Sequence, residues 1–73
     1  MRFVPGDMVR IGGRIADDDP NYHKRGIVAP YEDGCLVVNM IEPFRNGSTR
    51  ITWLPEAAWE LCSNAGVHFT SLL

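Results

Sequence analysis

The sequence lacks any long apolar run. No stretch approaches the roughly 20 consecutive apolar residues that a membrane-spanning helix requires. The first residues, MRFVPGDMVR, also lack the apolar centre of a secretory signal peptide. We therefore expect a cytoplasmic protein that has no contact with a membrane.

A strong charge of either sign is also absent. Seven Lys and Arg residues against nine Asp and Glu residues leave a net charge of -2. This balance excludes a strongly basic surface for nucleic acid, although a local basic patch remains compatible with it. The consecutive Asp17, Asp18 and Asp19 do not have the alternating spacing of a calcium-binding loop. They predict a solvated acidic loop that would repel nucleic acid or attract a basic partner.

Cysteine and histidine are scarce, with two residues of each type. Cys35 and Cys62 have no CxxC spacing, and the histidines form no HxxxH pair, so the ligand spacing of a zinc site is missing. No residue stands in the sequence context of a catalytic nucleophile. We expect no metal, no cofactor and no catalytic residue. We also predict that both cysteines are buried free thiols in strands.

The chain does contain short runs of β-branched and aliphatic residues separated by turn signals. Gly34 after Asp33 predicts a tight reversal between two of these runs. Pro55 predicts the end of a strand, because it has no N–H to donate to a ladder. Residues 55–58 predict a single helical or 3₁₀ turn, because the backbone of proline is preset for a first helical position. Residues 12–23 have no apolar periodicity and predict a long loop. Strands are predicted at residues 7–11, 26–31, 35–41, 49–54 and 59–62.

The run at residues 35–41 is apolar on both of its predicted faces. Only Asn39 interrupts the apolar residues, which are Cys35, Leu36, Val37, Val38, Met40 and Ile41. A strand with two apolar faces is central in a covered barrel or lies in a subunit interface. The partly apolar segment 63–73 predicts a docked tail or an extra strand. Both features predict a homo-oligomer.

The order of these elements resembles an SH3-like small β-barrel. Three segments support the resemblance: GDMVRI at residues 6–11 resembles the opening strand, KRGIV at residues 24–28 the second strand, and PEAAWEL at residues 55–61 the closing element. The resemblance implies a five-stranded all-β barrel over residues 1–62, followed by the tail at residues 63–73. It implies a fold more than an activity, because this fold serves many unrelated functions.

Two families with this fold share shorter motifs with the chain. KRGIV is similar to the KOW-type modules of ribosomal and transcription proteins, which implies RNA or protein contact through the loops. WLPEAAWE at residues 53–60 is similar to the closing segment of type II plasmid dihydrofolate reductases, which assemble as tetramers around one active pore. The pore-lining Val-Gln-Ile-Tyr of that family falls on Ile51, Thr52, Trp53 and Leu54 here, so no catalytic residue is carried over.

Aromatic rings and nearby cations are the candidates for contact with a partner. We expect at least one of Trp53 and Trp59 in the core, which leaves the tyrosines as surface rings. The favoured function is a non-enzymatic module that binds a protein partner and associates with itself. A nucleic-acid-binding module is the first alternative, and a tetrameric pore enzyme similar to the reductases is the second. The predicted contact surface consists of Tyr22, Lys24, Arg25, Tyr31 and Arg50.

Overall fold

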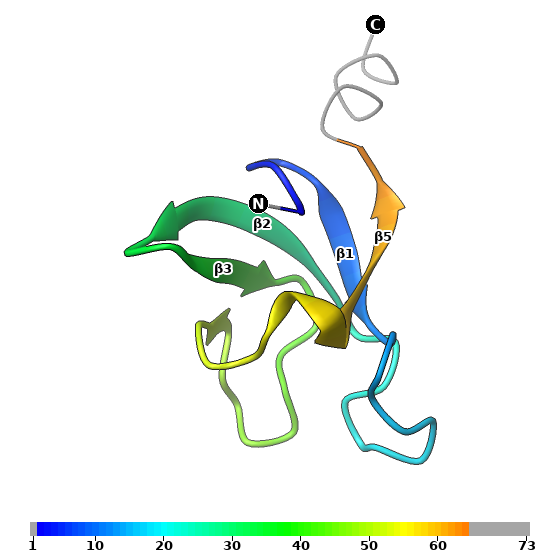
Figure 1. Ribbon diagram of the computed structural model, residues 1–73. Coiled ribbons are helices and arrows are strands. Elements are labelled where there is room, and N and C mark those ends of the chain that lie inside the picture. The colour runs from blue at the N-terminus through cyan, green and yellow to red at the C-terminus, as the bar shows by residue number, and fades with distance from the viewer. Residues whose placement is uncertain (1, 65–73) are drawn as a thin grey trace, which may run out of the picture.

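In the computed structural model, residues 2–64 form an all-β unit whose only helical element is one 3₁₀ turn (Figure 1). Most of the predicted tail, residues 65–73, lies outside the described residues. Within the described range, no helix has the length and apolar character needed to cross a membrane. The elements in chain order are β1 (Met8–Ile11), β2 (Arg25–Glu32), β3 (Cys35–Met40), β4 (Arg50–Ile51), η1 (Glu56–Ala58) and β5 (Trp59–Ser63).

All neighbouring strands are antiparallel, in the order β4-β3-β2-β1-β5. β1 therefore lies between β2 and β5, and the last strand of the unit runs beside the first. The sheet curves in Figure 1, but within the described residues β4 and β5 are its two edges and do not pair with each other. The prediction of a five-stranded all-β fold is confirmed, and the curved open sheet is compatible with a small β-barrel.

The hairpin between β2 and β3 forms where Asp33 and Gly34 predict it. The two residues have φ angles of 52° and 77°, the conformation of a two-residue type I′ turn. Glu32 and Cys35 face each other across this turn. Just before it the register shifts, around Pro30, which has no N–H to donate to a neighbouring strand. Local backbone chemistry thus explains both the turn and the irregularity beside it.

The core is filled from one face of the curved sheet. In β1 the buried Val9 and Ile11 alternate with half-buried neighbours, as the period of two predicts. Trp59 is 1% exposed, which confirms that at least one tryptophan lies in the core. Burial of apolar side chains is the main favourable term in folding a unit of this size. The buried cluster contains Phe3, Val9, Ile11, Val28, Leu36, Val38, Phe44, Ile51, Ala58 and Trp59.

The fourth strand is much shorter than predicted. The sequence predicts a strand over residues 49–54 with Trp53 on the same face as Ile51, but β4 ends at Ile51 and Trp53 is 55% exposed. The buried ring of Phe44 stacks on Trp59, with ring centres 6.5 Å apart, and fills the core there. Pro55 cannot extend the ladder. The chain therefore leaves the sheet after Ile51, and Trp53 stays outside the core.

On β3, Val37 is buried although it lies on the face opposite the core, whereas Cys35 and Asn39 on that same face are exposed. Val37 is 1% exposed although it does not belong to the main core cluster. Glu32 pairs with Cys35, and Arg50 pairs with Asn39, which places Glu32 and Arg50 on the same face of the sheet as Val37. Arg50 donates a hydrogen bond to the Glu32 carboxylate across β3. The aliphatic stem of an arginine is able to cover apolar surface, and this ion pair spans β3 on the face where Val37 lies.

Both cysteines are free thiols, but the prediction that they are buried is wrong, because both are exposed. Cys35 is the first residue of β3, directly after the turn, and Cys62 lies near the end of the edge strand β5. A buried residue needs neighbours on all sides. Strand ends and sheet edges do not supply them, so a strand position among apolar residues was not sufficient for burial.

The close packing of β2 against β3 makes Gly26 a sensitive position. Gly26 is buried opposite Met40, and an added Cβ would lie 2.5 Å from Val38 Cγ1 and 2.9 Å from the backbone oxygen of Asn39. Overpacking of a core costs about 1–3 kcal/mol. We expect Gly26→Ala to lower the free energy of unfolding by about 2 kcal/mol or more, measured by urea denaturation.

Gly34→Ala is the matched control for this experiment. Gly34 has a φ of +77°, and an added Cβ would meet no atom within 4 Å, so its substitution costs only backbone strain. That strain is about 1–2 kcal/mol for an L-residue. If Gly26→Ala proves no more destabilising than Gly34→Ala, close packing of β2 against β3 is not what requires a glycine.

Candidate functional site

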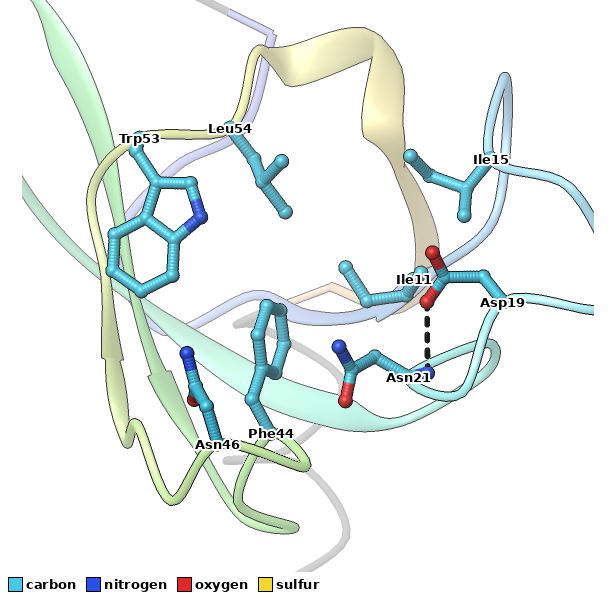
Figure 2. A pocket seen from close by; sticks show the side chains of 8 residues that line it. All are labelled: Ile11, Ile15, Asp19, Asn21, Phe44, Asn46, Trp53 and Leu54. Carbon is cyan, nitrogen blue, oxygen red and sulfur yellow. Dashed lines mark hydrogen bonds between the residues drawn. The ribbon is translucent and has the colours of Figure 1, made fainter.

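A cavity of about 250 Å³ opens between two loops and the segment that leads into η1. Residues 12–24 connect β1 to β2, and residues 41–49 connect β3 to β4; both loops lie at the lower end of the molecule in Figure 1. Side chains from both loops and from residues 53–54 surround the opening (Figure 2). The lining residues are Ile11, Ile15, Asp19, Asn21, Phe44, Asn46, Trp53 and Leu54.

Two aromatic rings form one side of this cavity. Phe44 is 7% exposed, and its ring meets the ring of Trp53 at a centre distance of 6.1 Å and an angle of 86°. Trp53 is 55% exposed, so its indole forms an accessible rim beside the buried phenyl ring. Tryptophan combines a large apolar area with a polar N–H and is enriched among the residues that dominate protein interfaces. Trp53 is therefore the leading candidate for contact with a partner.

The amide of Asn21 joins the two loops at the edge of the cavity. Its Oδ1 accepts a hydrogen bond from the backbone N–H of Arg45 at 2.8 Å and another from Lys24 Nζ at 3.3 Å. Lys24 Nζ also donates to the backbone oxygen of Pro43 at 2.9 Å. The 12–24 loop is thus tied to the 41–49 loop by Asn21 and Lys24. These contacts set the width of the opening.

Asp19 supplies the only charge among the lining residues. Its Oδ1 accepts a hydrogen bond from the backbone N–H of Asn21 at 2.8 Å, which orients the carboxylate (Figure 2). Its backbone oxygen accepts a hydrogen bond from the N–H of Tyr22 at 3.0 Å, so the residue sits in a well-defined turn. The exposed Asp17 and Asp18 precede it in the same loop. The cavity therefore opens beside a concentration of negative charge.

A second hollow, of about 410 Å³, lies on another side of Trp53. It shares Trp53 and Leu54 with the first cavity, and the exposed thiol residue Cys35 lines it. Trp53 therefore stands between two concave surfaces. The full lining is Gly34, Cys35, Leu36, Thr52, Trp53, Leu54, Pro55 and Glu56.

The three cations of the predicted contact surface all have partners in the chain. Lys24 holds the loops, Arg25 pairs with Glu42 at 3.4 Å, and Arg50 pairs with Glu32. The backbone N–H of Arg25 lowers the pKa of Glu42, and the hydrogen bond from Arg50 lowers the pKa of Glu32. The same hydrogen bond raises the pKa of Arg50. The two arginines therefore face glutamates of their own chain, and the lysine ammonium faces oxygens of Asn21 and Pro43.

The two tyrosines of the predicted surface lie toward opposite ends of β2. Tyr22 precedes the strand and stacks on His23, with ring centres 3.9 Å apart. Tyr31 packs against the core, its hydroxyl oxygen accepts a hydrogen bond from the backbone N–H of Phe3 at 3.3 Å, and burial raises its pKa. Tyr22 thus lies close to Lys24 and Arg25 in the chain, whereas Tyr31 is separated from them. None of the five predicted residues lines the first cavity.

Sequence reasoning selects none of the cavity residues for the contact surface. It assigns Asn46 to a turn, Asp19 to a solvated loop and Trp53 to a general set of aromatic rings. One sequence signal would have favoured Trp53 over Trp59 as the exposed contact residue. Trp53 lies two residues before Pro55, which ends the strand. A large ring at such a position is less constrained to follow the inward face of a sheet.

Within residues 2–64, no three or more His, Cys, Asp or Glu side chains converge as ligands for a metal. Comparisons of the chain with protein-family models, with curated proteins and with solved structures find no significant match. The geometry of the cavity is therefore the basis for a functional assignment.

The Asn21 amide offers a test of how the cavity is held open. In Asn21→Ala the N–H of Arg45 loses its protein acceptor, so we expect the free energy of unfolding to fall by about 0.5–1.5 kcal/mol. The Arg45 amide should also exchange faster with deuterium in NMR measurements. Asn21→Asp keeps an oxygen acceptor and should preserve the slow exchange. If the alanine and aspartate variants exchange equally fast, the side-chain oxygen does not join the loops.

Acid is expected to weaken the fold through Glu32 and Glu42. Both carboxyls have pKa values below the ordinary 4.5 in the folded chain. In mildly acidic solution the unfolded chain therefore binds more protons, so this contribution to stability is present above the unfolded pKa and is lost as pH falls through the folded pKa. The Tm should drop between about pH 5 and about pH 3.

The Glu32→Gln, Glu42→Gln double variant provides the comparison. Its Tm should be slightly lower than that of the wild type at neutral pH, because exposed ion pairs contribute little. Its decline with acid should be shallower. Parallel declines of the two proteins would assign the acid sensitivity to other carboxyls.

Proposed function

We propose that the chain is an SH3-like small β-barrel that acts as a non-enzymatic protein-binding module. The strand order β4-β3-β2-β1-β5 supports the fold assignment, because it brings the last strand beside the first. The long 12–24 loop, the tight turn between β2 and β3, and the 3₁₀ turn directly before β5 support it as well. These are the features on which the sequence resemblance rests.

The exposure of Trp53 at the rim of the cavity is the observation that carries the binding function. The walls beside it are apolar, from residues such as Ile15, Phe44 and Leu54, and only three lining residues are polar. A concave surface that combines apolar side chains with a few placed polar groups is typical of a recognition site. The second hollow adds a concave surface on another side of the ring. An extended polypeptide is able to contact the cavity and the second hollow at the same time, with Trp53 between them.

A protein partner fits the charges better than a nucleic acid does. Arg25 and Arg50 are paired with glutamates, and Asp19 faces the cavity from an acidic loop. Phosphate groups that approached the cavity would meet this negative charge, so electrostatic attraction would be lost where nucleic-acid binding depends on it. Binding of a polypeptide does not depend on attraction between phosphate groups and a basic surface.

The surface of β3 gives self-association less support than its sequence pattern does. Val37 is already buried within one chain, on the face of the sheet that the Glu32–Arg50 ion pair spans. Ile41 is 49% exposed, but single exposed apolar side chains are ordinary on protein surfaces. We therefore assign the contact to a different protein rather than to a second copy.

Selection of random peptides displayed on phage tests this function. Peptides enriched on the full chain should bind it in solution, and Trp53→Ala should weaken that binding at least about tenfold, because central tryptophans contribute strongly to interfaces. Ile41→Ala is the control, since Ile41 is similarly exposed and lines neither hollow. Failure to enrich any peptide, or equal binding to Trp53→Ala, would refute a contact site at the cavity.

A further inference from the structure

Resting on the proposed function, we infer that the cavity accepts the side chain of a lysine or arginine from the protein partner. The eight lining residues include one carboxylate, that of Asp19, and no Lys or Arg. The other polar groups are the neutral amides of Asn21 and Asn46. A cavity with this composition is electrostatically complementary to a single positive charge.

The Asp19 carboxylate has an oxygen available for such a charge. Its Oδ1 is held by the backbone N–H of Asn21, whereas within residues 2–64 its Oδ2 accepts no hydrogen bond. The residue is half-buried, so a cation placed there is partly shielded from water. A hydrogen bond between a charged donor and a carboxylate is stronger than one between neutral groups. The exposed Asp17 and Asp18 add long-range attraction for a basic segment.

The rings and the aliphatic walls match the remainder of the same side chain. In Figure 2, Trp53 lies across the opening from Asp19 with the N–H edge of its indole directed toward the opening, so a side chain that enters between them meets the indole on one side and the carboxylate on the other. The methylene stem of a lysine or arginine packs well on apolar surface, which Ile15 and Leu54 provide.

Lys24, Arg14 and Arg45 do not occupy the position beside the Asp19 carboxylate, so a cation from a partner has access to it. Lys24 is in the same loop as Asp19, but its ammonium group donates to Asn21 and to Pro43. Arg14 and Arg45 are exposed, and neither lines the cavity. An acidic side chain of a partner would be repelled by Asp19, and a neutral one would leave the carboxylate without a counter-charge.

Titration with matched peptides tests the inference. Peptides that differ only at a central Lys, Arg, Gln, Glu or Leu in a Gly-Ser background are added to the isotope-labelled full chain. The indole N–H signal of Trp53 and the side-chain amide signals of Asn21 and Asn46 are followed by NMR. We expect the Lys and Arg peptides to shift these signals and the Gln peptide to bind about fivefold more weakly, which corresponds to one partly exposed ion pair. Asp19→Asn should remove that preference.

Asp18→Asn is the matched control, because it removes the same charge from an exposed position outside the cavity; it should lose only the weak long-range attraction and keep most of the preference for Lys and Arg. Equal or tighter binding of the Gln, Leu or Glu peptide at Trp53 overturns the inference and leaves the protein-binding function intact. A preference for Lys and Arg that persists in Asp19→Asn also overturns it. If no peptide shifts the Trp53 signal, the inference and the proposed function both fail.

Discussion

The burial of Trp59 is the interaction on which the rest of the structure depends. Its ring is 1% exposed, lies at the start of β5 opposite Ile11 of β1, and stacks on Phe44 from the 41–49 loop. One side chain thus connects the last strand, the first strand and a distant loop. Loss of a buried aromatic side chain costs roughly 3–5 kcal/mol, a large share of the stability of a small domain. The same contact holds Phe44 as the inner wall of the cavity.

The rim of the cavity depends on polar contacts and on the distribution of charge. Asn21 accepts hydrogen bonds from Lys24 of its own loop and from Arg45 of the 41–49 loop, so a few hydrogen bonds hold the outer wall of the cavity. The inner wall, formed by Phe44, is part of the core. Arg25 and Arg50 are paired with glutamates, whereas Asp19 keeps one carboxylate oxygen without a hydrogen bond among the described residues. A site with a rigid apolar wall and a polar loop rim is suited to binding, because the core positions the ring and the loops adjust around a partner.

The parts of the fold that follow from the sequence depend on residues close together in the chain. Gly34 after Asp33 predicts the hairpin because both adopt positive φ, and Pro55 ends the strand because it cannot pair in a ladder and precedes the 3₁₀ turn because its φ is fixed near the helical value. The candidate site was less predictable. Its loops meet through Asn21 and Arg45, which are 24 residues apart, and the exposure of Cys35 depends on which strands surround it. The alternation of apolar and polar residues along the chain does not show which distant segments lie next to each other in the fold.

Trp53 and Trp59 separate what the sequence determined from what only the tertiary structure decided. The sequence by itself determined the turns, the approximate strands, the balanced charge and the acidic loop. It also places one tryptophan before Pro55 and one after it. Which tryptophan enters the core was decided by packing. Phe44, from a distant loop, takes the place beside Trp59 and leaves Trp53 at the rim across from Asp19. Because this outcome depends on competition among residues far apart in the chain for one small core, no local pattern contains it.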